Sequence, residues 1–135
     1  MKNINQFILT HSSFVAPTGR LLIASVFIMS GFNKMDNYSN TAGWMESMGV
    51  PGSLLPLVIA LEVLGSVAIM IGWQTRIISV LFAAFCVMSA VIFHADLSDQ
   101  YQMISFMKNI SIAGGFLFLV VNGAGAYSLD NRGKS

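Results

Sequence analysis

Reactive and charged residues are scarce in this chain of 135 residues, which has one cysteine, seven lysines and arginines and six acidic residues. A single Cys86 excludes an internal disulfide and a thiol relay, and we read it as a small core residue. Glycine-rich phosphate loops, nucleophile elbows and basic patches for nucleic acid are absent, so no nucleic-acid partner is expected. Instead, 55% of the residues are hydrophobic and the mean hydropathy is +0.70. A soluble domain of this size needs more polar surface, so the composition predicts a membrane protein.

Four apolar segments fill most of the chain, and each is close to the ~20 residues that a helix needs to cross a bilayer. They cover residues 17–35, 54–73, 76–94 and 103–122. No linker, charge block, low-complexity stretch or repeat divides them. We therefore predict an all-α integral membrane protein, a four-transmembrane-helix bundle that forms a single domain over residues 1–135.

The N-terminal stretch does not read as a cleaved signal peptide, because it is polar and has no compact apolar region or small-residue cleavage site. The first apolar segment should therefore remain as a span, with Pro17 in its first turn, where a missing N–H costs nothing. Ile4, Phe7 and Ile8 lie at helical spacing before it. This spacing suggests a short helix at the membrane interface.

Basic residues near the ends of the spans predict the orientation. With four spans both termini lie on one side, and that side also holds the turn between the second and third spans. Five basic residues fall on it, against Lys34 and Lys108 on the other side. The five are Lys2, Arg20, Arg76, Arg132 and Lys134. We predict that both termini are cytoplasmic and that the chain lies in a bacterial inner membrane.

Glu62 is the single ionisable residue in the apolar run LVIALEVLGSVAIMIG, residues 57–72. An ionised carboxylate near the bilayer centre costs ~3 kcal/mol on insertion scales, so it is expected to face the interior of the bundle and find a partner. Four other polar residues fall in the same, outer half of the predicted bundle: one at the end of the first span, one at the end of the third and two in the fourth. The predicted ligand-binding residues are Lys34, Glu62, His94, Lys108 and Asn109.

Four stretches resemble the DoxX family of small bacterial inner-membrane proteins, in order from Gly19 to Asp130. They are GRLLIASVFIMSGFNKM, PLVIALEVLGSVAIMIGWQTR, SAVIFH and FMKNISIAGGFLFLVVNGAGAYSLD. The family's pattern falls here on Gly19-Arg20, Ser30-Gly31, Lys34, Glu62, Thr75-Arg76, Phe93-His94 and Lys108-Asn109. The chain departs from it at Ala124, where many relatives have proline, which puts the rigidity of the final turn in question.

The resemblance implies a four-helix inner-membrane protein with a redox-linked role. The family takes its name from a subunit linked to a membrane thiosulfate:quinone oxidoreductase, and other members resemble partners of redox or stress-response proteins. For this chain it implies an oxidoreductase partner and a small apolar ligand such as a quinone.

The residues themselves fit a quinone better than other redox groups. A haem between helices usually has two axial ligands, and His11 and His94 are expected on opposite sides of the membrane. A metal at His94, Asp96 and Asp99 is conceivable, but polar residues in a solvated loop need no metal. We therefore predict no intrinsic cofactor, no metal and no catalytic residue. Lysine or His94 could donate to a quinone carbonyl, and Glu62 or His94 could exchange its protons.

Two other interpretations stay open at this point. In the first, Glu62 and a lysine form a buried ion pair that only stabilises the bundle of a scaffold protein, and His94 and Lys108 reach the headgroups. In the second, a relay between Glu62 and His94 serves a small proton-coupled transporter, for which four helices leave little room unless the chain forms a homo-oligomer.

Overall fold

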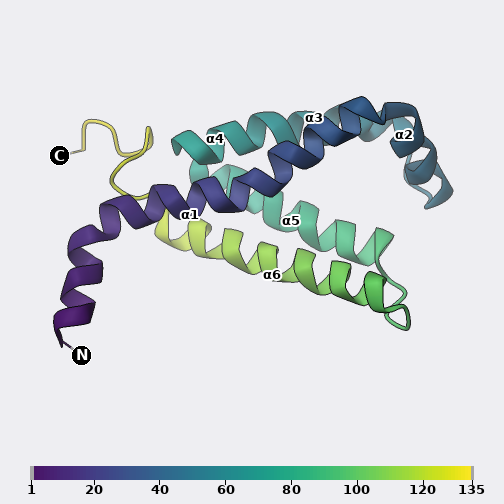
Figure 1. Ribbon diagram of the computed structural model, residues 1–135. Coiled ribbons are helices and arrows are strands. Elements are labelled where there is room, and N and C mark those ends of the chain that lie inside the picture. The colour runs from purple at the N-terminus through teal and green to yellow at the C-terminus, as the bar shows by residue number, and fades with distance from the viewer. Residues whose placement is uncertain (1, 135) are drawn as a thin grey trace.

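The computed structural model describes residues 2–134, and that part of the chain is helical, without strands (Figure 1). Four helical stretches are long and apolar enough to cross a membrane: Asn3–Asp36, Gly52–Ile71, Thr75–Phe93 and Gln100–Asn122. Each overlaps one of the predicted spans. The predicted all-α membrane architecture with four spans is therefore confirmed.

The first span differs from its prediction, because α1 (Lys2–Asp36) begins well before Pro17 and carries this proline in its interior. The prediction that Pro17 lies in the first turn was wrong. A proline inside a helix removes one hydrogen bond and clashes with the carbonyl four residues earlier, so the helix bends. Figure 1 shows the first turns of α1 angled away from the rest of the helix. At about 1.5 Å per residue, α1 is longer than the ~30 Å hydrocarbon core, so these turns extend beyond it.

The loop expected between the first two spans contains a helix, α2 (Tyr38–Ser47). The second span then runs through four consecutive helical pieces rather than one regular helix. They are the 3₁₀ turn η1 (Gly52–Leu54), α3 (Leu55–Ala60), the π-helical turn η2 (Leu61–Gly65) and α4 (Ser66–Ile71). Gly72 ends this span with a positive φ of 71°, a conformation that glycine adopts without strain. No pattern in the sequence indicates the π-helical turn, which contains Glu62.

The third and fourth spans, α5 (Thr75–Phe93) and α6 (Gln100–Asn122), pack along each other, and α1 packs on the second span. The two pairs meet in an aromatic cluster made of Phe27, Phe82 and Phe116. Phe82 stacks on Phe116 with ring centroids 4.8 Å apart, and Phe27 lies 4.7 Å from Phe82. Cys86 is fully buried against this cluster, as its reading as a core residue predicted.

We call the end of the bundle with both chain termini the terminal end, and the opposite end, with α2 and the α5–α6 connection, the loop end (Figure 1). At the terminal end, the C-terminal segment is fastened by Arg20, whose side chain is 1% exposed. Its guanidinium donates to the carbonyl oxygens of Ala124 (2.8 Å) and Tyr127 (2.6 Å). The turn at Ala124 is thus held by hydrogen bonds in place of a proline ring.

Two further side chains form hydrogen bonds to the backbone at the terminal end. Arg76 donates to the carbonyl oxygens of Val120 and Val121 in the last turn of α6. Asp130 accepts hydrogen bonds from the backbone amides of Gln74 (2.7 Å) and Thr75 (2.9 Å). Partial burial alone would raise the pKa of Asp130, but these amide hydrogen bonds hold it below its ordinary value. The two pairs of helices are therefore joined firmly at the terminal end.

Candidate functional site

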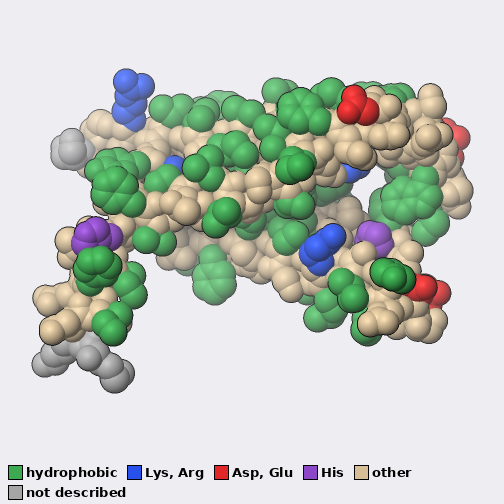
Figure 2. All heavy atoms as spheres, viewed as in Figure 1, with side chains coloured by type: hydrophobic (Ala, Val, Ile, Leu, Met, Phe, Trp, Pro, Cys, Tyr) green, Lys and Arg blue, Asp and Glu red, His purple; other side chains and the backbone are tan. Residues whose placement is uncertain are grey.

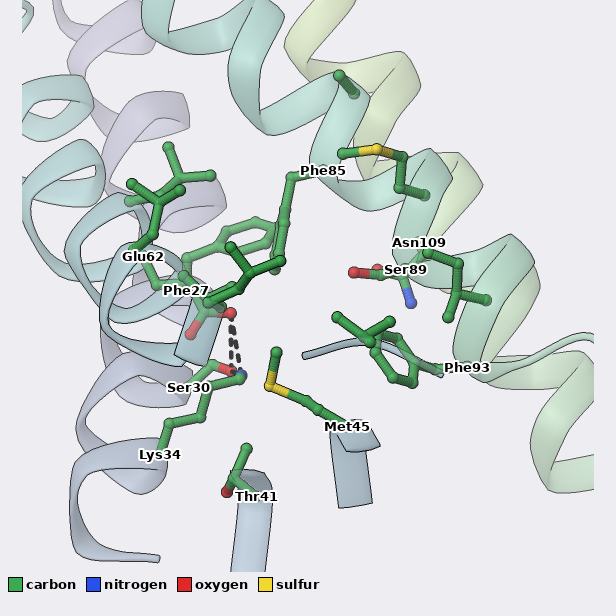
Figure 3. Close-up of a pocket in the computed structure, with 18 of the residues that line it drawn as sticks. Phe27, Ser30, Lys34, Thr41, Met45, Glu62, Phe85, Ser89, Phe93 and Asn109 are labelled. Carbon is green, nitrogen blue, oxygen red and sulfur yellow. Dashed lines mark hydrogen bonds and ion pairs between the residues drawn. The ribbon is translucent and has the colours of Figure 1, made fainter. Parts of the chain in front are cut away.

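A cavity of about 660 Å³ separates the two pairs of helices toward the loop end (Figure 3). Its volume lies within the range of small-molecule sites, and its walls come from all four spans and from α2. Most of the lining side chains are apolar. The polar ones are Ser30, Lys34, Thr41, Glu62, Ser89, His94, Lys108 and Asn109.

Glu62 reaches this cavity from the π-helical turn and is only 2% exposed. Helix α1 approaches the turn closely because residue 31 is a glycine. A Cβ at Gly31 would lie 2.6 Å from Cγ2 of Val63 and 3.2 Å from Cβ of Glu62, so any larger residue would push the two elements apart. Gly31 therefore brings the face of α1 that carries Ser30 and Lys34 within reach of the carboxylate.

The carboxylate forms an ion pair with Lys34, whose Nζ lies 3.0 Å from Oε1 of Glu62 (Figure 3). Ser30 donates its hydroxyl to the same oxygen at 3.2 Å and accepts a hydrogen bond from Lys34 Nζ at 2.6 Å. The second oxygen, Oε2, is buried and has no hydrogen-bond partner within residues 2–134. Lys34 is therefore the lysine that pairs with Glu62. One oxygen of the carboxylate still has room to accept hydrogen bonds.

The other three predicted site residues border the same cavity but form no hydrogen bond or ion pair with Lys34 or Glu62. His94 Nδ1 shares a hydrogen bond of 3.0 Å with the side-chain oxygen of Gln102. Asn109 donates from Nδ2 to the carbonyl of Ser105 at 3.0 Å, which leaves its second N–H and its oxygen free. The ammonium group of Lys108 has no hydrogen bond or ion pair to any residue from 2 to 134. The structure therefore gathers all five predicted residues around one space but pairs only two of them.

Sequence reasoning missed the residues from α2 that cover the cavity. Trp44 stacks on Phe93 with ring centroids 4.6 Å apart, and Met45 packs with Leu55 and Ile59 beneath it. In the sequence, Trp44 is an aromatic residue close to a predicted span, and such a residue is usually an anchor at the membrane interface. Ser30 was missed as a partner, although it lies one helical turn before Lys34 and therefore on the same face.

Carboxylates in the α5–α6 connection are engaged in local hydrogen bonds. Asp96 accepts hydrogen bonds from the hydroxyl and the amide of Ser98, which hold its pKa below its ordinary value. Asp99 accepts from the amide of Gln102 and caps α6. Among residues 2–134, no three histidine, cysteine, aspartate or glutamate side chains gather as metal ligands would. The chemistry that the cavity offers is hydrogen bonding and proton exchange.

Comparison with known proteins supports a single family. The model of the DoxX family matches residues 16–95. The chain is 44% identical over 111 residues to Inner membrane protein YqjF of Escherichia coli strain K12, covering 82% of this chain and 85% of that protein. It is 40% identical over 120 residues to Inner membrane protein YphA of the same organism, covering 84% and 86%.

A more distant relative carries an oxidoreductase name. The chain is 31% identical over 64 residues to "Putative oxidoreductase CatD" of Bacillus subtilis strain 168, covering 47% of this chain and 48% of that protein. No solved structure matches the chain.

Proposed function

Because the chain belongs to the DoxX family of inner-membrane proteins, we propose that its cavity binds a small apolar molecule with a polar head, such as a quinone. In this proposal the protein is the membrane subunit of a redox-linked complex, and a partner oxidoreductase supplies the electrons. The single observation that carries the proposal is the cavity itself, in which an ion pair and further polar side chains, among them His94, Lys108 and Asn109, face apolar walls.

The polar side chains suit a head that carries carbonyl oxygens. Lys108 has a free ammonium group, Asn109 has a free N–H, and Lys34 uses only part of its three donors on Ser30 and Glu62. A quinone carbonyl accepts hydrogen bonds from such groups. Glu62 and His94 are the residues around the cavity that can take up or release a proton when a quinone is reduced or a quinol oxidised.

The redox-linked part of the proposal draws support from one relative named as an oxidoreductase. The protein's own residues agree with electrons that come from a partner. The one cysteine is buried in the core, and the two histidines lie at opposite ends of the structure, too far apart to hold one haem together. We further propose that both termini are cytoplasmic, on the basis of the basic residues near the ends of the spans.

Fluorescence of Trp44 gives a direct test, because this side chain lines the cavity and the only other tryptophan is Trp73. In the Trp73→Phe protein in lipid nanodiscs, a ubiquinone with one isoprenoid unit should quench Trp44 saturably. The double substitution Lys34→Met with Glu62→Gln removes the charged pair, so it should weaken this binding about tenfold or more, equivalent to at least 1.4 kcal/mol.

The Trp44→Phe protein is the matched control. Its remaining Trp73 lies beyond the other end of the second span and should show only the linear quenching of a quinone dissolved in lipid. Equal, unsaturable quenching of both tryptophans would overturn the proposal.

The bond between Lys34 and Glu62 favours one other function, a scaffold in which the pair only stabilises the bundle. This function predicts that wild type and the double variant bind no quinone and assemble equally well with a partner protein. The titration above separates the two, because a scaffold gives no saturable quenching in either protein.

A further inference from the structure

Aromatic side chains lie at both ends of the cavity along the axis of the bundle. At the loop end, the stack of Trp44 on Phe93 joins α2 to the end of α5. Toward the terminal end, the aromatic cluster of Phe27, Phe82 and Phe116 fills the space between the helix pairs. Aromatic rings therefore separate the cavity from the water beyond α2 and from the terminal end of the bundle.

The sides of the cavity are open where the helix pairs diverge, and Figure 2 shows space passing between them near the loop end. Between α3 and α5 the opening is bordered by apolar side chains, which we call the apolar window: Leu57, Leu81, Ala84 and Met88. These side chains are exposed although they lie in membrane spans; Leu57 is 69% and Met88 is 55% exposed. Exposed apolar residues at this depth face lipid.

The opposite side, between α1 and α6, has a different character. Lys34, Lys108 and Asn109 border the cavity there. The opening between α1 and α6 therefore carries three polar side chains, whereas the apolar window carries none; Glu62, Ser89 and His94 are polar groups elsewhere on the cavity wall. This asymmetry gives a bound molecule one orientation, with its head among the lysines and the asparagine and any tail toward the apolar window.

We propose that the ligand is a long-tailed amphiphile of the bilayer, such as a polyisoprenoid quinone, and that it enters sideways through the apolar window. This inference rests on the proposed function and adds the ligand's class and its path. A tail gains little by leaving lipid for a wall of leucine and methionine, since lipid chains are equally apolar. The polar groups therefore hold the head inside the cavity, while the tail of the bound molecule passes out through the window into the lipid.

The inference predicts that narrowing the window affects tailed quinones selectively. Ala84 is small and exposed at the middle of the window, so Ala84→Phe should block a tail without touching the polar residues. In the Trp73→Phe protein in nanodiscs, this substitution should weaken binding of a ubiquinone with ten isoprenoid units about tenfold or more, equivalent to at least 1.4 kcal/mol. Binding of the same quinone ring without a tail should stay within about twofold, equivalent to about 0.4 kcal/mol.

Val87→Phe is the control, because Val87 is 43% exposed on the same helix but does not border the cavity. It should leave both quinones unaffected. Met88→Phe, one turn along α5 from Ala84, should reproduce the loss and replaces Ala84→Phe where that variant does not fold.

The outcomes separate this inference from the proposed function. Saturable binding of both quinones by the parent protein, with no selective loss in the window variants, would overturn the lateral path and leave the proposed function standing. Failure of the parent protein to bind either quinone would overturn both.

Discussion

Lys34→Met is expected to lower the free energy of unfolding by about 3–5 kcal/mol, the largest effect of any single substitution that we predict. The substitution leaves the carboxylate of Glu62 without its cation in a position that is 2% exposed. A buried charge without a partner is costly, whereas a pair removed as a whole costs little. Equilibrium unfolding in mixed detergent micelles, followed by circular dichroism, measures the change.

The double variant Lys34→Met with Glu62→Gln is the control for this prediction. It leaves no buried charge, and Ser30 can still donate to the side-chain oxygen at position 62. Its stability should return to within about 1 kcal/mol of wild type. Equal stability of Lys34→Met and wild type would show that the ion pair does not hold the two helices together.

Arg20→Met is expected to cost about 3 kcal/mol, because a charged donor of two hydrogen bonds is lost. The carbonyl oxygens of Ala124 and Tyr127 would lose their partner, and the C-terminal segment would come loose from the terminal end. Equilibrium unfolding in mixed micelles measures the loss of stability. In addition, the backbone amides of Leu129 and Asp130, which donate to the carbonyl oxygens of Ile71 and Gly72, should exchange their hydrogens faster.

Arg132→Met provides the comparison, because Arg132 has the same charge and lies in the C-terminal segment that Arg20 fastens, but it is exposed. Its effect should stay within about 0.5 kcal/mol, as for most surface substitutions. Similar losses from both substitutions would mean that net charge, and not the buried contacts of Arg20, stabilises this end.

The positions of the spans could be predicted because they depend on a property of the sequence alone, the length of each apolar run. The grouping of Lys34, Glu62, His94, Lys108 and Asn109 could be predicted for a related reason. Once four helices cross one bilayer, the position along each run gives the depth of each residue. Depth alone is enough to place these residues in the same half of the bundle.

The rotation of each helix about its own axis, and the irregular parts of the backbone, could not be predicted in this way. Depth does not say which lysine turns toward Glu62; that choice depends on the close approach of α1 at Gly31. The π-helical turn that carries Glu62 has no signal in the apolar pattern. Helix α2 is short and only weakly apolar, so the apolar pattern does not indicate it, although it provides Trp44 at the cover of the cavity.

The burial of Arg20 could not be predicted from the distribution of basic residues either. The sequence places it near the end of a span, where a basic side chain is expected to reach the headgroups. The structure instead buries it, with its hydrogen bonds directed to backbone carbonyls from a segment about a hundred residues away in the chain. Such a contact depends on the path of the C-terminal segment, which no local pattern encodes.

Glu62 is best explained by the site as a whole. A carboxylate in the middle of an apolar span is retained where it faces a cation and a cavity rather than lipid. Here one oxygen meets Lys34 and Ser30, and the cavity beside the pair is wide enough for a ligand. We infer that this cavity holds a head-and-tail molecule from the bilayer.

Mass spectrometry of the molecules that accompany the protein out of the membrane tests that claim most directly. Wild type and the double variant Lys34→Met with Glu62→Gln would be extracted into native nanodiscs and compared after their folding is checked by thermal melting. We expect a quinone or another long-tailed molecule with a polar head to be enriched with wild type and lost from the folded double variant. Identical small molecules in equal amounts from both proteins would contradict it.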